Sequence, residues 1–255
     1  MPQFYLAPES LKDKTFLLKG PEAFHVTKVL RYREGQTLVL FDGKGGRYEG
    51  VIQKIHGDGS VSGALTAILQ AAQERKPASL RLYQGLLKAS HWDLVLEKGT
   101  ELGVEAFIPV LTPRTVVLLH EAERRKAKQE RWSRVILAAA KQCQRPKLPE
   151  LREPIEFREA VRGCQGLTLL AWEGLSGAAA SGSLRLALRE ADQNRGRESL
   201  GINLFVGPEG GFTEEEVELA ESLGAVVFGL GPRILRAETA AIAAVSLIQY
   251  ELGSL

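Results

Sequence analysis

Cysteine is scarce in this chain. Its two cysteines, Cys143 and Cys164, are widely separated, and neither belongs to a C-x-x-C pair. Disulfide-rich domains and zinc modules need several closely spaced cysteines, so neither is expected here. The four histidines, at positions 25, 56, 91 and 120, have no metal-ligand spacing. The sequence therefore predicts a protein of the reducing cytosol without a bound metal ion.

Long hydrophobic runs are also absent. No apolar stretch reaches the roughly 20 residues that a membrane-spanning helix requires. The segment from Met1 to Tyr5 lacks the basic-then-apolar pattern of a secretory leader. With 44% hydrophobic and 25% charged residues, the composition is that of an ordinary globular protein. We therefore expect a cytoplasmic protein without a membrane partner.

The common glycine-rich nucleotide loops are missing as well. No G-x-x-x-x-G-K-[ST] is present, and no G-x-G-x-x-G follows an expected strand. The stretch from Gly43 to Gly46 is rich in glycine, but no helix is expected after it. A phosphate-binding loop and a dinucleotide site of the usual kinds are therefore unsupported.

Acidic charge is sparse in the middle of the chain. Residues 75–163 contain 18 Lys and Arg against 11 Asp and Glu, a local charge of +7, although the whole chain carries only +2. Residues 164–255 contain 6 against 12, a local charge of −6. A basic segment suits a polyanionic partner, since displacing counterions from phosphates favours binding. Charge alone supports a solvated helix face equally well.

Residues 1–72 are expected to be rich in β-strands. Apolar stretches at residues 37–41 and 48–52 flank a strong hairpin signal, Asp42 to Gly46, and a second turn is expected at residues 56–60. This pattern predicts a small β-barrel or an open sheet. Polar residues and a proline at residues 71–77 predict a linker.

From residue 80 onward, expected strands alternate with expected helices. The strands are expected at residues 80–86, 106–110, 167–172, 202–206 and 226–230. The helices are expected at residues 91–102 with Ser90 as N-cap, at 121–141 with Trp132, Val135, Ile136 and Ala139 buried, at 184–191 and at 240–251. Thr213 and Glu216 form a capping box that starts one more helix. Repeated alternation predicts a parallel sheet in an α/β domain.

Two segments near the C-terminus, residues 207–212 and 230–240, each follow an expected strand. Ligands of open α/β sheets bind at the carboxyl ends of strands, and glycines let a ligand approach the main chain. Glycine content alone slightly favours a tight turn before a capped helix. The second segment concentrates charged and polar side chains: Arg233, Arg236, Glu238 and Thr239. Two arginines and a carboxylate can orient a charged substrate, or form a structural ion pair.

Together these two segments resemble the signature of bacterial 16S ribosomal RNA uridine-N3 methyltransferases, members of the SPOUT superfamily. The segment from Lys98 to Val104 resembles the family's K-A-T-E-L-G-V, with Gly99 in place of alanine. Residues 142–145 resemble its Q-S-G-R, with two substitutions. His25, Val29-Leu30-Arg31 and Gly35 resemble its PUA-like RNA-binding module. The resemblance covers nearly the whole chain.

The resemblance implies a fold, a reaction and partners. It implies a PUA-like β-barrel domain at residues 1–72 and a SPOUT α/β domain with a deep trefoil knot at residues 77–255. It implies a homodimer that binds S-adenosylmethionine and methylates uracil N3 of a specific uridine in 16S rRNA, in an assembled small ribosomal subunit. Alternatives left open are a SPOUT methyltransferase for tRNA or another rRNA position, and a non-catalytic RNA-binding or ribosome-assembly protein.

The resemblance also assigns site residues. The cofactor is expected to contact Trp172, Glu173, Val206, Gly207, Pro208, Glu209, Gly210, Gly211, Leu230, Gly231, Arg233, Ile234, Leu235 and Ala240. A core role for Trp172 is equally compatible with its position. Methylating uracil N3 requires loss of its proton, so Arg236 is expected to stabilise the uridinate, with Glu238 as a base or as an orienter of Arg236.

RNA contacts are expected from both domains. In the first domain the candidates are Arg31, Arg33, Lys44 and Arg47, with Tyr32 to stack on a base. In the second domain they are Arg114, Arg145 and Lys147. Each of these side chains is equally compatible with simple solvation.

Overall fold

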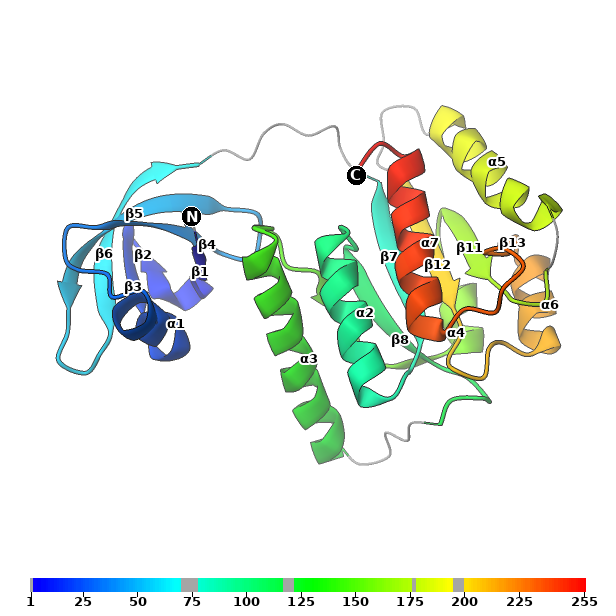
Figure 1. The fold of residues 1–255 in the computed structure, drawn as a ribbon, viewed down its shortest axis with the longest axis horizontal. Coiled ribbons are helices and arrows are strands. Elements are labelled where there is room, and N and C mark those ends of the chain that lie inside the picture. Colours follow the sequence, from blue (N-terminus) through cyan, green and yellow to red (C-terminus); the bar gives the residue numbers. More distant parts are fainter. Residues whose placement is uncertain (1, 70–77, 117–121, 176–177, 195–199) are drawn as a thin grey trace. The chain divides into compact units, whose positions relative to one another are not determined.

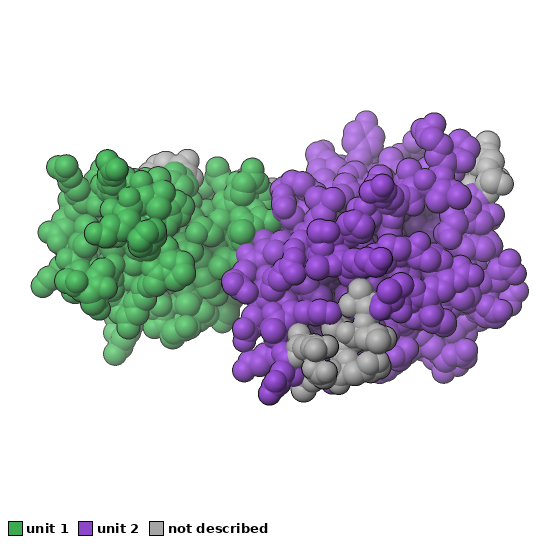
Figure 2. Space-filling view, turned by 60° about the horizontal axis from the view of Figure 1, so that its bottom comes forward, with its two compact units in different colours: residues 1–75, 137–148 green, residues 76–136, 149–255 purple. Residues whose placement is uncertain are grey.

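The computed structural model describes residues 2–69, 78–116, 122–175, 178–194 and 200–255. The chain forms two compact units, shown in different colours in Figure 2. Unit 1 contains residues 1–75 and 137–148, and unit 2 contains residues 76–136 and 149–255. The expected linker at residues 71–77 lies outside the described residues. No helix among the described residues is both long and apolar enough to cross a bilayer.

Unit 1 is built on a six-stranded sheet with the strand order β1-β4-β5-β6-β3-β2. Its strands are β1 (Gln3–Tyr5), β2 (Leu11–Lys12), β3 (Thr15–Leu18), β4 (Thr37–Phe41), β5 (Arg47–Ile55) and β6 (Val61–Ile68). β1 pairs parallel with β4, and the other pairs are antiparallel. Its short helices are η1 (Pro8–Ser10), α1 (Gly20–Phe24) and η2 (His25–Val29).

The predicted hairpin at residues 42–46 is confirmed, because it joins β4 to β5. Asp42 Oδ1 accepts hydrogen bonds from the backbone N–H of Lys44 at 2.7 Å and of Gly46 at 2.9 Å. An aspartate at the start of a turn closes it in this way. Phe4, Phe16 and other apolar side chains form the core of unit 1.

Residues 137–148 belong to unit 1, although they include the last residues of a long helix (Ala122–Gln142) whose earlier part belongs to unit 2. Polar contacts hold them there. Gln3 Nε2 donates to the carbonyl of Ala140 at 3.1 Å, and Lys141 Nζ lies 2.7 Å from Glu22 Oε1. The partners are more than 100 residues apart in the sequence, and such a pairing leaves no local signal. Arg145 and Lys147, expected in the second domain, are therefore grouped with unit 1.

Unit 2 contains a seven-stranded sheet that is parallel throughout, which confirms the predicted parallel α/β sheet. Its strands are β7 (Ser79–Gly85), β8 (Ala106–Leu111), β9 (Glu150–Leu151), β10 (Ile155–Glu156), β11 (Leu167–Ala171), β12 (Gly201–Val206) and β13 (Val226–Phe228). The order is β10-β8-β7-β12-β11-β13, with β9 also paired to β8. The central strands are almost entirely buried, as expected when helices cover both faces.

Helices cover the two faces of this sheet (Figure 1). The covering helices are α2 (Ala89–Glu101), α4 (Phe157–Arg162), α5 (Ala178–Asn194), α6 (Glu214–Ser222) and α7 (Ala237–Glu251). The long helix α3 (Ala122–Gln142) contacts α2, where Trp132 packs on Trp92. α2 and α7 pack side by side on one face, and α4 and α6 pack against each other on the other. In α3, Trp132, Ile136 and Ala139 are buried as predicted, whereas Val135 is half-buried.

Helix ends were predicted with mixed success. The capping box of α6 is confirmed, since Thr213 Oγ1 accepts from the N–H of Glu216 and Glu216 Oε2 accepts from the N–H of Thr213. The prediction of Ser90 as an N-cap is wrong. α2 begins two residues earlier than expected, at Ala89, and its N-cap is Lys88, whose side chain makes no cap hydrogen bond. α5 and α7 also begin before the expected residues 184 and 240, because apolar periodicity marks the buried part of a helix rather than its end.

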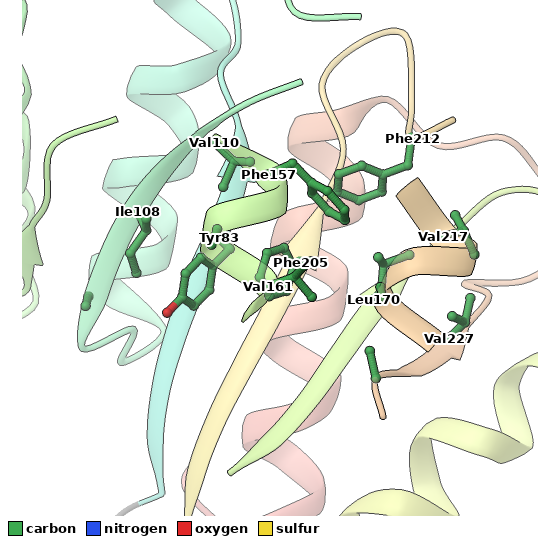
Figure 3. Packing of buried hydrophobic residues seen from close by; sticks show 14 residues of the cluster. Tyr83, Ile108, Val110, Phe157, Val161, Leu170, Phe205, Phe212, Val217 and Val227 are labelled. Carbon is green, nitrogen blue, oxygen red and sulfur yellow. The ribbon is translucent and has the colours of Figure 1, made fainter. Parts of the chain in front are cut away.

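An aromatic cluster fills the face covered by α4 and α6 (Figure 3). Tyr83 of β7 stacks on Phe205 of β12, with ring centroids 4.4 Å apart and 13° between the planes. The ring of Phe157 of α4 contacts the rings of Phe205 and Phe212, with centroid distances of 5.7 and 5.1 Å. Burial raises the pKa of Tyr83 to about 12, so its phenol stays neutral. Since Phe212 ends the first C-terminal segment, this core anchors that segment.

Candidate active site

Four neighbouring strands of unit 2 end at the same edge of the sheet. Gln84 of β7 is in register with Val206 of β12, and Val206 is in register with Ala171 of β11. Ala171 is in register with Phe228 of β13. The loops that follow these strands therefore meet, as the carboxyl ends of parallel strands do. Both C-terminal segments singled out in the sequence are among these loops.

A cavity of about 320 Å³ lies at this edge. Its lining includes every residue expected to contact the cofactor except Gly210, together with Arg236 and Glu238. The lining residues that were not expected are His91, Ala171, Pro232 and Ala237. A pocket of this size, with apolar walls and a few converging polar groups, suits a small organic molecule.

The first segment, residues 207–212, forms a braced wall. Gly210 does not line the cavity, but its carbonyl accepts a hydrogen bond from Arg114 Nη1 at 2.9 Å. The same Nη1 atom donates to the carbonyl of Phe212 at 3.1 Å. Arg114, expected to contact RNA, thus has its guanidinium on this loop.

Glycine is required at one position of the braced wall. Gly211 has a φ of +69°, a conformation that residues with a Cβ rarely adopt. A Cβ there would lie 2.1 Å from Oε1 of Glu173, so the loop packs directly on that carboxylate.

Gln84 braces the same wall from β7. Its side chain is fully buried, and its Nε2 donates to the carbonyls of Gly207 at 2.9 Å and of Val206 at 3.3 Å. The neighbouring Gly85 allows close approach, because a Cβ on it would lie 2.3 Å from the nitrogen of Pro208. Sequence reasoning missed Gln84, whose contacts lie more than 120 residues away.

The second segment, residues 230–240, forms a more exposed wall. Ile234 is 87% exposed, and Arg233 and Arg236 are exposed as well. Arg236 is the N-cap of α7, and Glu238 in the first turn is buried. Among the described residues, neither arginine pairs with Glu238. The structural Arg–Glu pair considered from the sequence is therefore not formed.

His91 is the titratable residue that sequence reasoning missed. It lies in the first turn of α2, after β7, and its Nδ1 is 3.8 Å from both Glu209 Oε1 and Glu238 Oε2. Glu209 Oε1 also accepts the backbone N–H of Lys88 at 3.0 Å. The sequence offered one signal for His91. It follows a strand that ends at the same sheet edge as the two C-terminal segments, and the loops after neighbouring strands meet there.

Trp172 combines both roles considered for it. It lines the cavity and also packs against the core cluster of the α4–α6 face. Its backbone N–H donates to the carbonyl of Phe228 at 3.0 Å, which ties the end of β11 to the end of β13.

The remaining predicted RNA contacts lie in unit 1. Lys44 and Lys147 form a β-bridge and are both exposed, and Arg47 Nη2 donates to Gln144 Oε1 at 3.2 Å. Arg31 and Arg33 are exposed, and Arg145 is half-buried. Tyr32 is half-buried and contacts Phe4 edge-on at 6.4 Å, so part of its ring belongs to the core.

Comparison with known proteins matches both units of the chain to protein families. Residues 74–249 match the family described as an RNA methyltransferase domain, and residues 18–65 match an RNA methyltransferase PUA domain. Unit 1 thus contains a PUA-like domain, and unit 2 is a methyltransferase domain with a parallel sheet.

Curated relatives and solved structures agree with these matches. The ribosomal RNA small subunit methyltransferase E of Bacillus subtilis is 31% identical over 93% of this chain and 90% of its own length. A methyltransferase from Legionella pneumophila, solved with the cofactor SAM, has a TM-score of 0.81 and 30% identity, covering 97% of this chain and 96% of its own.

A further structure, the ribosomal RNA small subunit methyltransferase E of Neisseria gonorrhoeae bound to S-adenosyl methionine, has a TM-score of 0.79 and 29% identity. It covers 98% of this chain and 97% of its own. With both domains matched and curated relatives aligned along almost the whole sequence, the chain belongs to the ribosomal RNA small subunit methyltransferase E family.

Proposed function

We propose that this protein transfers the methyl group of S-adenosylmethionine to N3 of a specific uracil in 16S rRNA. The observation that carries the proposal is the cavity, because it unites at one sheet edge the two segments that resemble the family signature. The solved relatives that bind S-adenosylmethionine support the assignment of this cavity to the cofactor. The substrate is taken to be the rRNA of an assembled small ribosomal subunit.

The residues of the cavity fit the cofactor. Backbone groups of Gly207 and Gly231, with the apolar side chains of Leu230, Leu235 and Ala240, suit the flat adenine ring of the cofactor. Glu173 and Glu209 offer negative charge to a sulfonium and an amino group, and Arg233 offers positive charge to a carboxylate. When bound, S-adenosylmethionine supplies an electrophilic methyl group, so the protein has only to position and deprotonate the base.

The second wall carries the groups that act on uracil. Loss of the N3 proton leaves negative charge on the base, which a cation and a helix N-terminus both stabilise. Arg236 stands at the N-terminus of α7, and Ala237 and Glu238 of that helix line the cavity. Arg236 therefore stabilises the uridinate, and the buried Glu238 orients groups around it.

The wider architecture follows from the same proposal. The N-terminal sheet is taken as a PUA-like β-barrel domain over residues 1–72 that contacts RNA, with Lys44, Arg47 and Lys147 among the contacts. Residues 77–255 are taken as a SPOUT domain with a trefoil knot, acting as a homodimer. Mass measurement in solution tests the dimer, and a monomer at working concentration contradicts it.

The experiment for the reaction is nucleoside analysis by mass spectrometry. Unmodified small subunits and naked 16S rRNA are incubated with the protein and methyl-labelled S-adenosylmethionine. We expect labelled 3-methyluridine from the subunit. Label in tRNA, or in a different nucleoside, supports another SPOUT specificity. Failure to bind the cofactor supports a non-catalytic RNA-binding protein.

A further inference from the structure

We propose that His91 is the general base that removes the N3 proton of uracil, with Glu238 and Glu209 as the residues that fix its orientation. The inference rests on the proposed function and adds to it a proton acceptor from a segment that neither C-terminal motif contains. The geometry around Nδ1 of His91 carries it.

Three elements converge on this imidazole. His91 comes from the first turn of α2, Glu209 from the loop after β12 and Glu238 from the first turn of α7. Both carboxylate distances to Nδ1 are 3.8 Å, and α2 and α7 pack together along their length. All three residues line the cavity.

Two polar atoms are left unpaired at this point. His91 Nδ1 and Glu238 Oε2 are both buried, and neither has a hydrogen-bond partner among the described residues. Buried polar atoms without partners are costly, and they concentrate where a site tightens when its substrate binds. The Glu238 side chain is only 9% exposed, so water screens this carboxylate little.

The carboxylates select one tautomer of the imidazole. A proton on Nδ1 faces two acceptors, whereas a lone pair on Nδ1 would face two negative charges. Neutral His91 therefore carries its hydrogen on Nδ1 and leaves Nε2 as the proton acceptor, the logic by which a carboxylate orients a catalytic histidine. The His91 side chain is 37% exposed, so part of the ring is accessible although Nδ1 is buried.

The proton transfer balances in charge and electrons. Nε2 takes the proton of uracil N3, and the electron pair of the N–H bond remains on N3. N3 then forms its bond to the methyl carbon, while the electron pair of the carbon–sulfur bond goes to sulfur. The positive charge that the sulfonium loses appears on the imidazolium, where Glu209 and Glu238 stabilise it.

Other charged groups face the same space. From the second wall these are Arg233 and Arg236, and from the loop after β11 it is Glu173. On α2 itself, Asp93 is paired with Arg131. The two carboxylates beside Nδ1 are thus the acidic groups that select the tautomer of His91. Arg236 remains available to stabilise the uridinate.

Replacing His91 by asparagine tests the base. Asparagine keeps a donor near the position of Nδ1 but cannot accept the proton. Single-turnover methyl transfer at neutral pH should fall by about 10²- to 10⁴-fold, the usual contribution of a general base. Cofactor affinity, measured by calorimetry, should change by less than about threefold. The matched control is His56→Asn, because His56 lies in unit 1 against Ser62 and outside the cavity.

The pH dependence sharpens the test. The wild-type rate should rise with pH, because only the neutral imidazole of His91 can accept the proton. The H91N variant should lack this rise, and its defect should shrink at alkaline pH, where uracil ionises by itself. A wild-type-like pH profile in H91N, or a rate within about threefold of wild type, overturns the proposal. Absence of transfer by the wild type instead defeats the proposed function.

A second readout does not depend on activity. Nitrogen-15 NMR of the enzyme without cofactor should show His91 protonated on Nδ1 in its neutral form. Glu238→Gln should weaken that preference. Protonation on Nε2 in the neutral wild type overturns the assignment, whatever the kinetics.

Discussion

The two walls of the cavity are built in opposite ways. The wall at residues 207–212 is held by Gln84, by Arg114 and by Phe212 in the core, and Gly211 packs on Glu173. In the wall at residues 230–240, residues 230–236 have no regular structure, and Ile234 among them is 87% exposed. The difference separates a wall whose shape the protein fixes from a wall that presents charged groups to a substrate. Mutations in the two walls should therefore fail in different ways.

The largest expected effect is on stability, at the braced wall. Phe212→Ala removes a buried ring that contacts Phe157, and it should lower the free energy of unfolding by about 3–5 kcal/mol. Ile234→Ala, in the exposed wall, should change it by less than about 0.5 kcal/mol. Chemical denaturation of both variants measures this contrast. Equal losses in the two variants would show that the exposed wall is also structural.

The next largest effect is on the rate of methyl transfer and concerns the exposed wall. Arg236→Ala should lower the rate of methyl transfer by about 10²- to 10³-fold, the usual cost of removing one donor that stabilises a developing anion. Its affinity for S-adenosylmethionine and its melting temperature should remain close to wild type, because the side chain is exposed and makes no cap hydrogen bond to α7. Arg233→Ala is the neighbouring control and should act on cofactor affinity. Near-normal turnover by R236A contradicts the assignment.

Smaller effects should distinguish a residue that supports the cofactor site from a residue that contacts RNA. Arg114→Ala removes two hydrogen bonds to the braced wall, so it should lower stability by about 1–2 kcal/mol and weaken cofactor binding. Lys44→Ala should leave cofactor binding unchanged but reduce the salt dependence of RNA affinity by about one unit of slope. Calorimetry with cofactor and RNA titrations at several salt concentrations distinguish them. If R114A behaves like K44A, Arg114 is an RNA contact.

The same contrast explains what the sequence could predict. Short apolar runs alternating with amphipathic stretches specify a parallel sheet, and Thr213 with Glu216 specifies a helix start, because these signals are local. The two motifs could be placed in one site because carboxyl strand ends meet at one edge. This rule and the family resemblance together predicted most of the residues that line the cavity.

The contacts that brace the site could not be predicted. Arg114 reaches a carbonyl 96 residues away, and Gln84 reaches one 123 residues away. Neither residue type is distinctive, and a single sequence carries no record of which distant positions pair. His91 escaped notice for a related reason. Its side chain has no partner in its own segment, and its two carboxylates, one from a loop and one from the first turn of α7, lie more than 100 residues further on.

The smallest expected effect concerns the helix that follows the braced wall. Burial raises the pKa of Glu216, the capping-box residue of α6, above that of an exposed glutamate. A raised pKa in the folded state means that folding takes up a proton. The contribution of Glu216 to the free energy of unfolding therefore falls as pH rises from about 4.3 through the raised pKa. At neutral pH the buried, ionised carboxylate still lowers stability.

Glu216→Gln removes this penalty while keeping an oxygen that can accept the N–H of Thr213. The lost attraction between the carboxylate and the helix N-terminus opposes that gain, so the free energy of unfolding at pH 7 should change by less than about 1 kcal/mol. Relative to the variant, the wild type should gain stability as pH falls from 7 to 4. Denaturation curves at several pH values measure the difference. A wild type that loses stability relative to E216Q over that range would show that the capping hydrogen bond, and not burial, governs the carboxylate.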